Sequence, residues 1–195
     1  MSAKSTRPYE KRRRAEAELQ TRRRITEATV ELHRTVGPAR TTVSAIAQRA
    51  GVQRATVYRH FPEDADLFAA CSAHWIGLHP FPAIDAWPAI ADPQERIRTA
   101  LGELYAYYRT VEPMLANVRR DAQLLPALRA VLAGAGGYFA ALEEILVAGW
   151  DGDPTRRRAG LALALDFATW QTLTQTLSDA DAAALMARMV ACAQR

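Results

Sequence analysis

Residues 50–61, "AGVQRATVYRHF", bring several hydrogen-bonding side chains close together. Arginine can make two parallel hydrogen bonds to a guanine edge, threonine offers a hydroxyl and a methyl group, and tyrosine and histidine can donate to phosphate. At helical spacing, Val52 and Val57 would be buried while the polar side chains face outward. The stretch is therefore either an ordinary solvated helix or a surface that contacts a nucleic acid.

The charge of the chain is unevenly distributed. Residues 1–60 carry 14 Lys and Arg against 5 Asp and Glu, whereas residues 61–195 carry 11 against 16. This segregation of positive charge favours a polyanionic partner for the N-terminal third of the chain.

Metal and cofactor sites find little support in the sequence. Cys71 and His74 form only an i, i+3 pair on an apolar helix, and His79 and Cys192 do not complete a zinc pattern. The stretch "GAGG", residues 134–137, follows no predicted strand and lacks the lysine of a phosphate-binding loop. We interpret it as a kink, a close backbone approach or a tolerated weak point in a helix, and we predict no metal and no cofactor.

Catalysis and membrane insertion are also not expected. The sequence offers no arrangement of a nucleophile with its base, and no paired carboxylates on one helix face, so we predict that the protein is not an enzyme. It contains no long uncharged apolar run and no secretory signal, which predicts a soluble cytoplasmic protein.

Helical spacing recurs along the chain, which predicts an all-α protein of about nine helices. Residues 1–15 are highly charged with few large apolar side chains, so we expect a flexible basic arm there. A helix then continues to about Thr35, and a second begins at Thr42, a good N-cap, and ends at Gly51. The residues after Gly51 supply a third helix, which gives this region the pattern of a helix-turn-helix.

The proline-rich segment "PFPAIDAWPAIADP", residues 80–93, predicts a domain boundary. We therefore expect a helix-turn-helix domain over 16–62, a connecting helix over 63–79 and a second helical domain over 80–195. Within the second domain, we expect helices from Asp92, around 112–120, from about 125 to 149, from 154 to 177, and from Ser178 onward.

The sequence "TTVSAIAQRAGVQRATVYRHFPEDADLF", residues 41–68, resembles the tetracycline-repressor (TetR) family of bacterial transcription regulators. The similarity extends back through "RRRITEATVELHRTVG", residues 22–37, and its specific part covers about a quarter of the chain. The resemblance implies an N-terminal helix-turn-helix domain that binds DNA. It also implies a C-terminal helical domain that binds an effector and forms a dimer.

The resemblance further implies where individual residues act. Thr42 would cap its helix and contact a phosphate, while the side chains at 54–56 would meet base edges and Tyr58 and His60 would contact phosphates. Two residues depart from the family pattern, because Gln53 is a weaker N-cap than serine and Asp64 replaces a common lysine. We expect basic residues of the first helix to compensate, and the full set of expected DNA contacts is Arg22, Arg23, Arg24, Thr42, Arg54, Ala55, Thr56, Tyr58, Arg59 and His60.

The second domain is expected to form a homodimer and to bind a small apolar or amphipathic effector. The apolar surface of the predicted helices over 154–177 and after Ser178 is too wide for a solvated helix, and the expected dimer residues are Leu161, Leu165, Ala168, Leu185 and Met189. Aromatic residues concentrate in the same domain, and they either form its core or line a pocket. The expected lining residues are Tyr105, Tyr108, Met114, Phe139, Phe167 and Trp170, with Asn117 and Gln171 as polar contacts.

These observations together predict a ligand-responsive repressor that binds a palindromic operator as a dimer. Two other interpretations stay open at this point. The protein could be an activator or architectural DNA binder without an effector, or a helical small-molecule binding or carrier protein with a weakened helix-turn-helix. The residues Gln53 and Asp64 favour the carrier interpretation.

Overall fold

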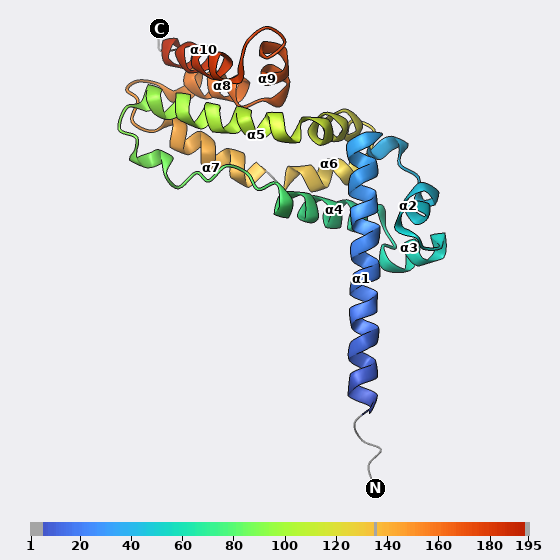
Figure 1. The fold of residues 1–195 in the computed structure, drawn as a ribbon. Coiled ribbons are helices and arrows are strands. Elements are labelled where there is room, and N and C mark those ends of the chain that lie inside the picture. The colour runs from blue at the N-terminus through green and yellow to red at the C-terminus, as the bar shows by residue number, and fades with distance from the viewer. Residues whose placement is uncertain (1–5, 135, 194–195) are drawn as a thin grey trace. The chain divides into compact units, whose positions relative to one another are not determined.

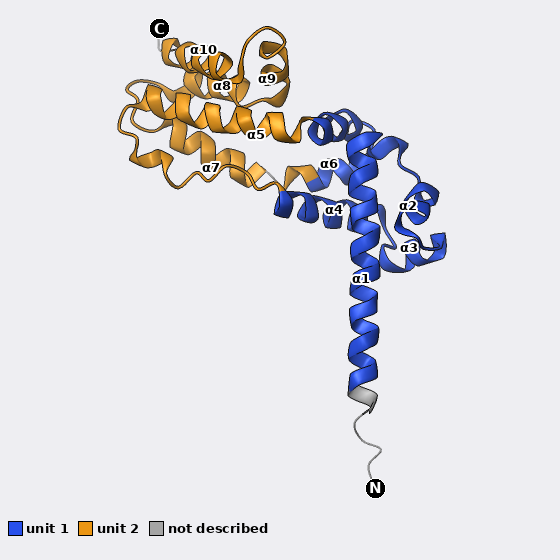
Figure 2. Cartoon of the chain, in the orientation of Figure 1, with its two compact units in different colours: residues 1–78, 113–131 blue, residues 79–112, 132–195 orange. Residues whose placement is uncertain are grey.

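The computed structural model describes residues 6–134 and 136–193, and within these ranges it contains ten α-helices, two short 3-10 helices and no strand (Figure 1). The prediction of an all-α protein is confirmed. The chain forms two compact units, one comprising Met1–Leu78 with Pro113–Val131 and the other His79–Glu112 with Leu132–Arg195 (Figure 2). The sequence placed all of 80–195 in one domain, whereas the structure assigns residues 113–131 to the first unit.

The first unit is built around a long N-terminal helix. It contains α1 (Thr6–Thr35), η1 (Pro38–Arg40), α2 (Val43–Ala50), α3 (Arg54–His60), α4 (Asp64–Leu78), the end of α5 (Pro93–Ala122) and most of α6 (Pro126–Ala133). The apolar faces of α1 to α4 and of the end of α5 meet in one core, because each short helix can bury only one stripe and needs the others to cover it. The buried residues of this core are Ile25, Ala28, Val30, Ile46, Ala47, Ala50, Val57, Phe61, Leu67, Cys71 and Met114.

Helix α1 is longer than the sequence predicted. The expected flexible arm over 1–15 is helical from Thr6, while residues 1–5 lie outside the described part of the chain. Arginine, lysine, glutamate and alanine are good helix formers, and extending an existing helix avoids the cost of nucleating one. The high charge of this segment is therefore compatible with helix, although it prevents burial.

Residues 113–131 belong to the first unit because they hold the end of α1. The Asn117 Nδ2 donates to the backbone carbonyls of His33 and Arg34, at 3.2 and 2.9 Å. The buried Asp121 accepts the backbone N–H of Ala39 at 2.9 Å and an Arg120 hydrogen bond at 2.7 Å. Burial alone would raise the pKa of Asp121, but these hydrogen bonds and the nearby arginine charges hold it below its ordinary value.

The second unit contains η2 (Trp87–Ala89), the first part of α5, α7 (Gly136–Val147), α8 (Pro154–Ala164), α9 (Phe167–Leu173) and α10 (Asp179–Cys192). Trp87 is 1% exposed, so it anchors the proline-rich connection in the core of this unit. The buried Arg96 donates to the carbonyls of Ile90, Ile145 and Ala148 at 2.8–3.0 Å. It therefore joins the start of α5 to the end of α7.

Three helix predictions need correction. The helix expected over 112–120 is part of α5, which continues through Pro113. The helix expected over 125–149 is divided into α6 and α7 around the "GAGG" stretch, where a Cβ at Gly136 or Gly137 would meet nothing within 4 Å. The helix expected over 154–177 ends at Ala164, because Asp166 caps a new helix by accepting the N–H groups of Ala168 and Thr169.

No single helix in the described ranges is long and apolar enough to cross a membrane. Only α6 and α7, taken together across their break, reach the necessary length and hydropathy.

Candidate nucleic-acid interface

The turn between α2 and α3 has the local geometry that its sequence predicts. Thr42 caps α2, its Oγ1 accepting the N–H of Ala45 at 3.1 Å. Gly51 ends α2 with φ 65°, a left-handed conformation that glycine adopts without steric cost. Ile46 on α2 and Val57 on α3 are both buried. These features fix α3 against α2 with one face in the core and the opposite face outside.

The outward face of α3 presents the side chains expected to contact DNA. Arg54, Ala55 and Arg59 are exposed, Tyr58 is 50% exposed, and Thr56 is half-buried. Among the described residues, neither Arg54 nor Arg59 takes part in an ion pair. The helix therefore offers two charged groups, a hydroxyl and a phenol on one short surface.

Gln53 and Asp64 lie at the starts of α3 and α4. The Gln53 side chain makes no capping hydrogen bond, which confirms the weak cap that its residue type predicts. Asp64 is exposed in the first turn of α4, where negative charge suits the helix dipole. It therefore has a helix-stabilising role without offering a cation to a phosphate.

Arg22 and His60 join α1 to the end of α3. The Arg22 guanidinium lies 4.0 Å from the centre of the Phe61 ring and donates to the carbonyl of His60. The Nε2 of His60 is buried and has no partner in the described residues. Burial and then the charge of Arg59 lower the pKa of His60, so its ring is neutral at neutral pH. Arg22 is therefore held by contacts within the protein, and one nitrogen of His60 is buried.

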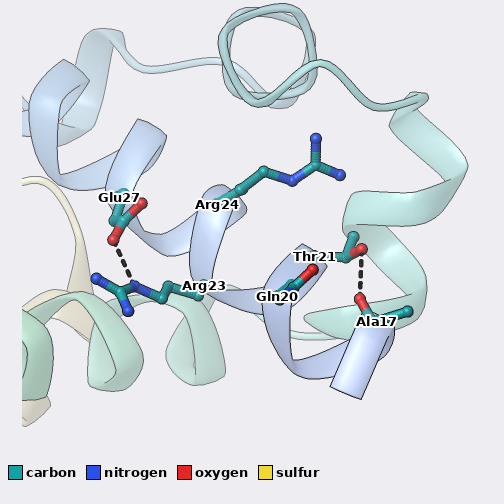
Figure 3. A pocket seen from close by; sticks show the side chains of 6 residues that line it. All are labelled: Ala17, Gln20, Thr21, Arg23, Arg24 and Glu27. Carbon is teal, nitrogen blue, oxygen red and sulfur yellow. Dashed lines mark hydrogen bonds and ion pairs between the residues drawn. The ribbon is translucent and has the colours of Figure 1, made fainter. Parts of the chain in front are cut away.

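Arg23 and Arg24 border a hollow on the surface of α1 (Figure 3). Arg23 forms an ion pair with Glu27 at 2.7 Å, and Figure 3 shows the Arg24 guanidinium pointing away from that pair. A Cβ built on Gly51 would lie 3.9 Å from Arg24 Nη1, so this side chain lies beside the turn. Of the three arginines of α1 expected to contact DNA, Arg24 is the exposed one without an ion pair in the described ranges.

Residues 25–71 match the family model of bacterial regulatory proteins, tetR family. Over this segment, about a quarter of the chain, the protein is similar to bacterial regulators of the tetR family. The match runs from the buried part of α1 through α2 and α3 into α4, the segments that form the interface described above. DNA binding and transcription regulation are supported for the chain at this level.

Solved structures of regulators share the fold over most of the chain. A transcriptional regulator from Rhodococcus sp. Rha1 is 19% identical, with 87% of this chain and 95% of that one covered at a TM-score of 0.60. NalD of Pseudomonas aeruginosa, the secondary repressor of the MexAB-OprM multidrug efflux pump, is 21% identical, with 91% and 97% covered at 0.60. The fatty acid degradation regulator FadR of Bacillus halodurans is 18% identical, with 87% and 93% covered at 0.58. No curated protein sequence matches the chain.

The structure does not bring all the expected effector residues together. Met114 lies in the core of the first unit, and Asn117 uses its amide there to hold the end of α1. In the second unit, the hydroxyls of Tyr105 and Tyr108 donate to the carbonyls of Ala164 and Leu165, at 2.8 and 2.6 Å. Phe167 and Trp170 are also at most 1% exposed. These four aromatic residues therefore form a packed core.

A second aromatic group in the same unit is only half-buried. It consists of Phe81, Tyr107, Tyr138 and Phe139, in which Phe81 stacks on Tyr138 with ring centres 4.5 Å apart. The Tyr138 hydroxyl donates to the carbonyl of Pro82 at 3.1 Å, and burial raises the pKa of Tyr138 to about 12. Phe81 was not among the residues expected from the sequence to line a pocket. The one local indication was its position as an aromatic residue between two prolines. The remaining expected residue, Gln171, donates to Glu112 at 3.4 Å.

Some of the expected dimer residues are buried within the chain, and others are exposed. Leu161 and Leu165 are only 0% and 8% exposed within the single chain, so they offer little surface to a partner. They are buried because α8 packs against α7 and α10, with Gly160 close to Val190. Ala168 and Met189 are exposed and Leu185 is half-buried, while Leu163, on the opposite side of α8 from Leu161, is 60% exposed.

Proposed function

We propose that this protein is a dimeric, ligand-responsive repressor that binds a palindromic operator with α3 in the major groove. The observation that carries the proposal is the outward face of α3, on which Arg54, Thr56 and Tyr58 stand on a helix fixed by Thr42 and Gly51. An isolated helix-turn-helix of this size buries only about 600–1,000 Å² on DNA, so a second copy is needed for tight specific binding. The site of action is then the cytoplasm, where the DNA is.

The base-contact role is tested by selecting bound sequences from a random duplex pool at near-physiological salt. We expect one palindrome to be enriched. Arg54→Ala should then relax the preference at one base pair in each half-site and cost about 1–3 kcal/mol per half-site, as for a paired arginine–guanine contact. Arg98→Ala in the second unit removes the same charge far along the sequence and is the matched control. Binding without enrichment of any sequence would refute the proposal and favour the carrier alternative.

Dimerisation is proposed through the exposed apolar residues of α8 and α10. Leu163 and Met189 are 60% and 54% exposed, and large apolar side chains concentrated on adjacent helices are typical of an interface between copies. Leu163→Glu with Met189→Glu should convert a dimer to a monomer in analytical ultracentrifugation. Leu124→Glu, at a 71% exposed leucine of the first unit, should leave the dimer intact.

The effector is proposed to be a small apolar or amphipathic molecule bound by the half-buried group of Phe81, Tyr107, Tyr138 and Phe139. Half-buried rings can give up their mutual contacts to a ligand at lower cost than a fully buried core can. NalD is a repressor of an efflux pump, and the repressing role proposed here is of the same kind. A ligand that raises the melting temperature of wild type, but not of Tyr138→Ala, and that lowers operator affinity would support this part.

A further inference from the structure

The N-terminal half of α1 is a charged helix that no other part of the described chain covers. Every residue from Tyr9 to Gln20 is exposed, and Figure 1 shows α1 continuing well past α2 and α3. Four consecutive cations, Lys11 to Arg14, occupy this segment. Like charges three residues apart destabilise a helix, and helices without tertiary packing are only marginally stable in water. The binding of a polyanion would therefore stabilise this part of α1.

Two of these cations already have partners on α1. Arg12 forms an ion pair with Glu16 at 2.8 Å, and the Arg13 guanidinium lies 5.9 Å from the centre of the Tyr9 ring. Lys11 and Arg14 form no ion pair or hydrogen bond within the described ranges. They are therefore the cations most available to an outside anion.

Lys11 and Arg14 also lie on a particular face of the helix. Residues 11, 14, 18 and 22 follow one another at three- and four-residue steps, which places them in one row along α1. At the end of that row, Arg22 contacts His60 and Phe61, and the charge of Glu18 acts on His60. The row thus faces the side of α1 on which α3 ends.

The distance along the row suits a second contact with the same DNA. Lys11 lies seven residues before Glu18, or about 10 Å along the helix axis. DNA carries one phosphate charge per about 1.7 Å of axis, and its major groove is about 12 Å wide. A duplex that holds α3 in its groove therefore has backbone phosphates within reach of a cation about 10 Å past the end of α3.

We infer that residues 9–20, the α1 extension, are a second DNA-binding element, in which Lys11 and Arg14 bind backbone phosphates beside the groove that α3 occupies. The inference rests on the proposed DNA-binding function and adds phosphate contacts from a segment outside the matched residues 25–71. These contacts add affinity and salt dependence but no base preference, because phosphates carry no sequence information.

The test compares two double variants of the full-length protein with equal loss of charge. Lys11→Gln with Arg14→Gln removes the cations of the row, whereas Arg12→Gln with Arg13→Gln removes their neighbours on the other side of the helix. Binding to the selected operator is measured from 50 to 300 mM salt. In a dimer the double variant removes two phosphate contacts from each protomer, four in all, so the slope of log K against log salt should fall by about 3.6. At 0.1 M salt this is an affinity loss of up to about 4,000-fold. The control variant should lose much less, and base preference should be unchanged in both.

Equal losses in the two variants, or no loss in either, would overturn the inference. Circular dichroism of each variant before the titration shows whether the helix content has changed, and Lys11→Arg with Arg14→Lys should restore the wild-type slope. If wild type shows no sequence preference, the proposed function fails, yet the same comparison on a random duplex still decides the role of Lys11 and Arg14. Phosphate contacts operate on any duplex, so the two failures are distinguishable.

Discussion

His33 is a buried histidine on α1 whose protonation should weaken the first unit in mild acid. It is 4% exposed, its ring lies 5.7 Å from that of Phe68, and burial lowers its pKa to about 4 although the charge of Asp121 acts in the opposite direction. In the unfolded chain, the same ring has an ordinary pKa of about 6.5. The unfolded state therefore binds more protons between these two values, and stability must fall as the pH falls through that window.

The magnitude follows from the two pKa values. A shift from about 6.5 to about 4 corresponds to roughly 3 kcal/mol over the whole window, of which about 2 kcal/mol is lost between pH 7 and pH 5. Asp121 does not contribute in this range, because its pKa is held below an ordinary value of 3.8. Its contribution to stability is present above that value and is lost only at lower pH.

Hydrogen exchange by mass spectrometry can measure this loss in each unit separately. Peptides covering residues 25–35 should show an opening free energy lower by about 2 kcal/mol at pH 5 than at pH 7, after correction for the intrinsic rate. Peptides from 97–108 in the second unit serve as the internal control. The variant His33→Gln should be less stable at both pH values, but its pH dependence should be reduced by the same 2 kcal/mol. An unchanged pH dependence in this variant would refute the reasoning.

Three further predictions concern single residues. Gly37 has φ 92°, and a Cβ there would collide with Arg120 and Asp121. Gly37→Ala should therefore destabilise the first unit by more than about 1 kcal/mol in thermal unfolding. Gly102→Ala is the control, because a Cβ at Gly102 would contact no other atom within 4 Å. Burial raises the pKa of the Cys71 thiol to about 12 while Cys192 is exposed, so a thiol reagent at pH 8 should modify one equivalent rapidly and the second only after unfolding. Gln53→Ser should supply the missing cap of α3 and stabilise the first unit by about 0.5–1 kcal/mol; an unchanged melting temperature would contradict that explanation.

Local signals were sufficient for the helix-turn-helix. Thr42 and Gly51 act through their own backbone and the next turn, and Val57 is buried because of spacing alone. Residues of this kind can be interpreted from a short window of sequence, which is why the candidate interface was predicted more completely than any other part.

Features that depend on distant segments could not be predicted in this way. Nothing near Asn117 indicates that its amide holds the carbonyls of His33 and Arg34, more than 80 positions earlier. Leu161 and Leu163 are alike in sequence, and only the packing of α8 decides that the first is covered by its own chain and the second is not. The α1 extension was expected to be flexible because it has few large apolar residues. Such a composition indicates that a segment is not buried in a core, but it does not indicate whether the segment is helical.

The first unit consists of two stretches of chain, and this has a consequence for how such a protein can be recombined. A crossover after Leu78 would carry α1 to α4 into a new protein but would leave Asn117 and Asp121 behind. A functional exchange needs junctions at 78/79, at 112/113 within the continuous α5, and at 131/132. Fusions that treat the N-terminal segment as a detachable module should therefore fold poorly unless residues 113–131 travel with it.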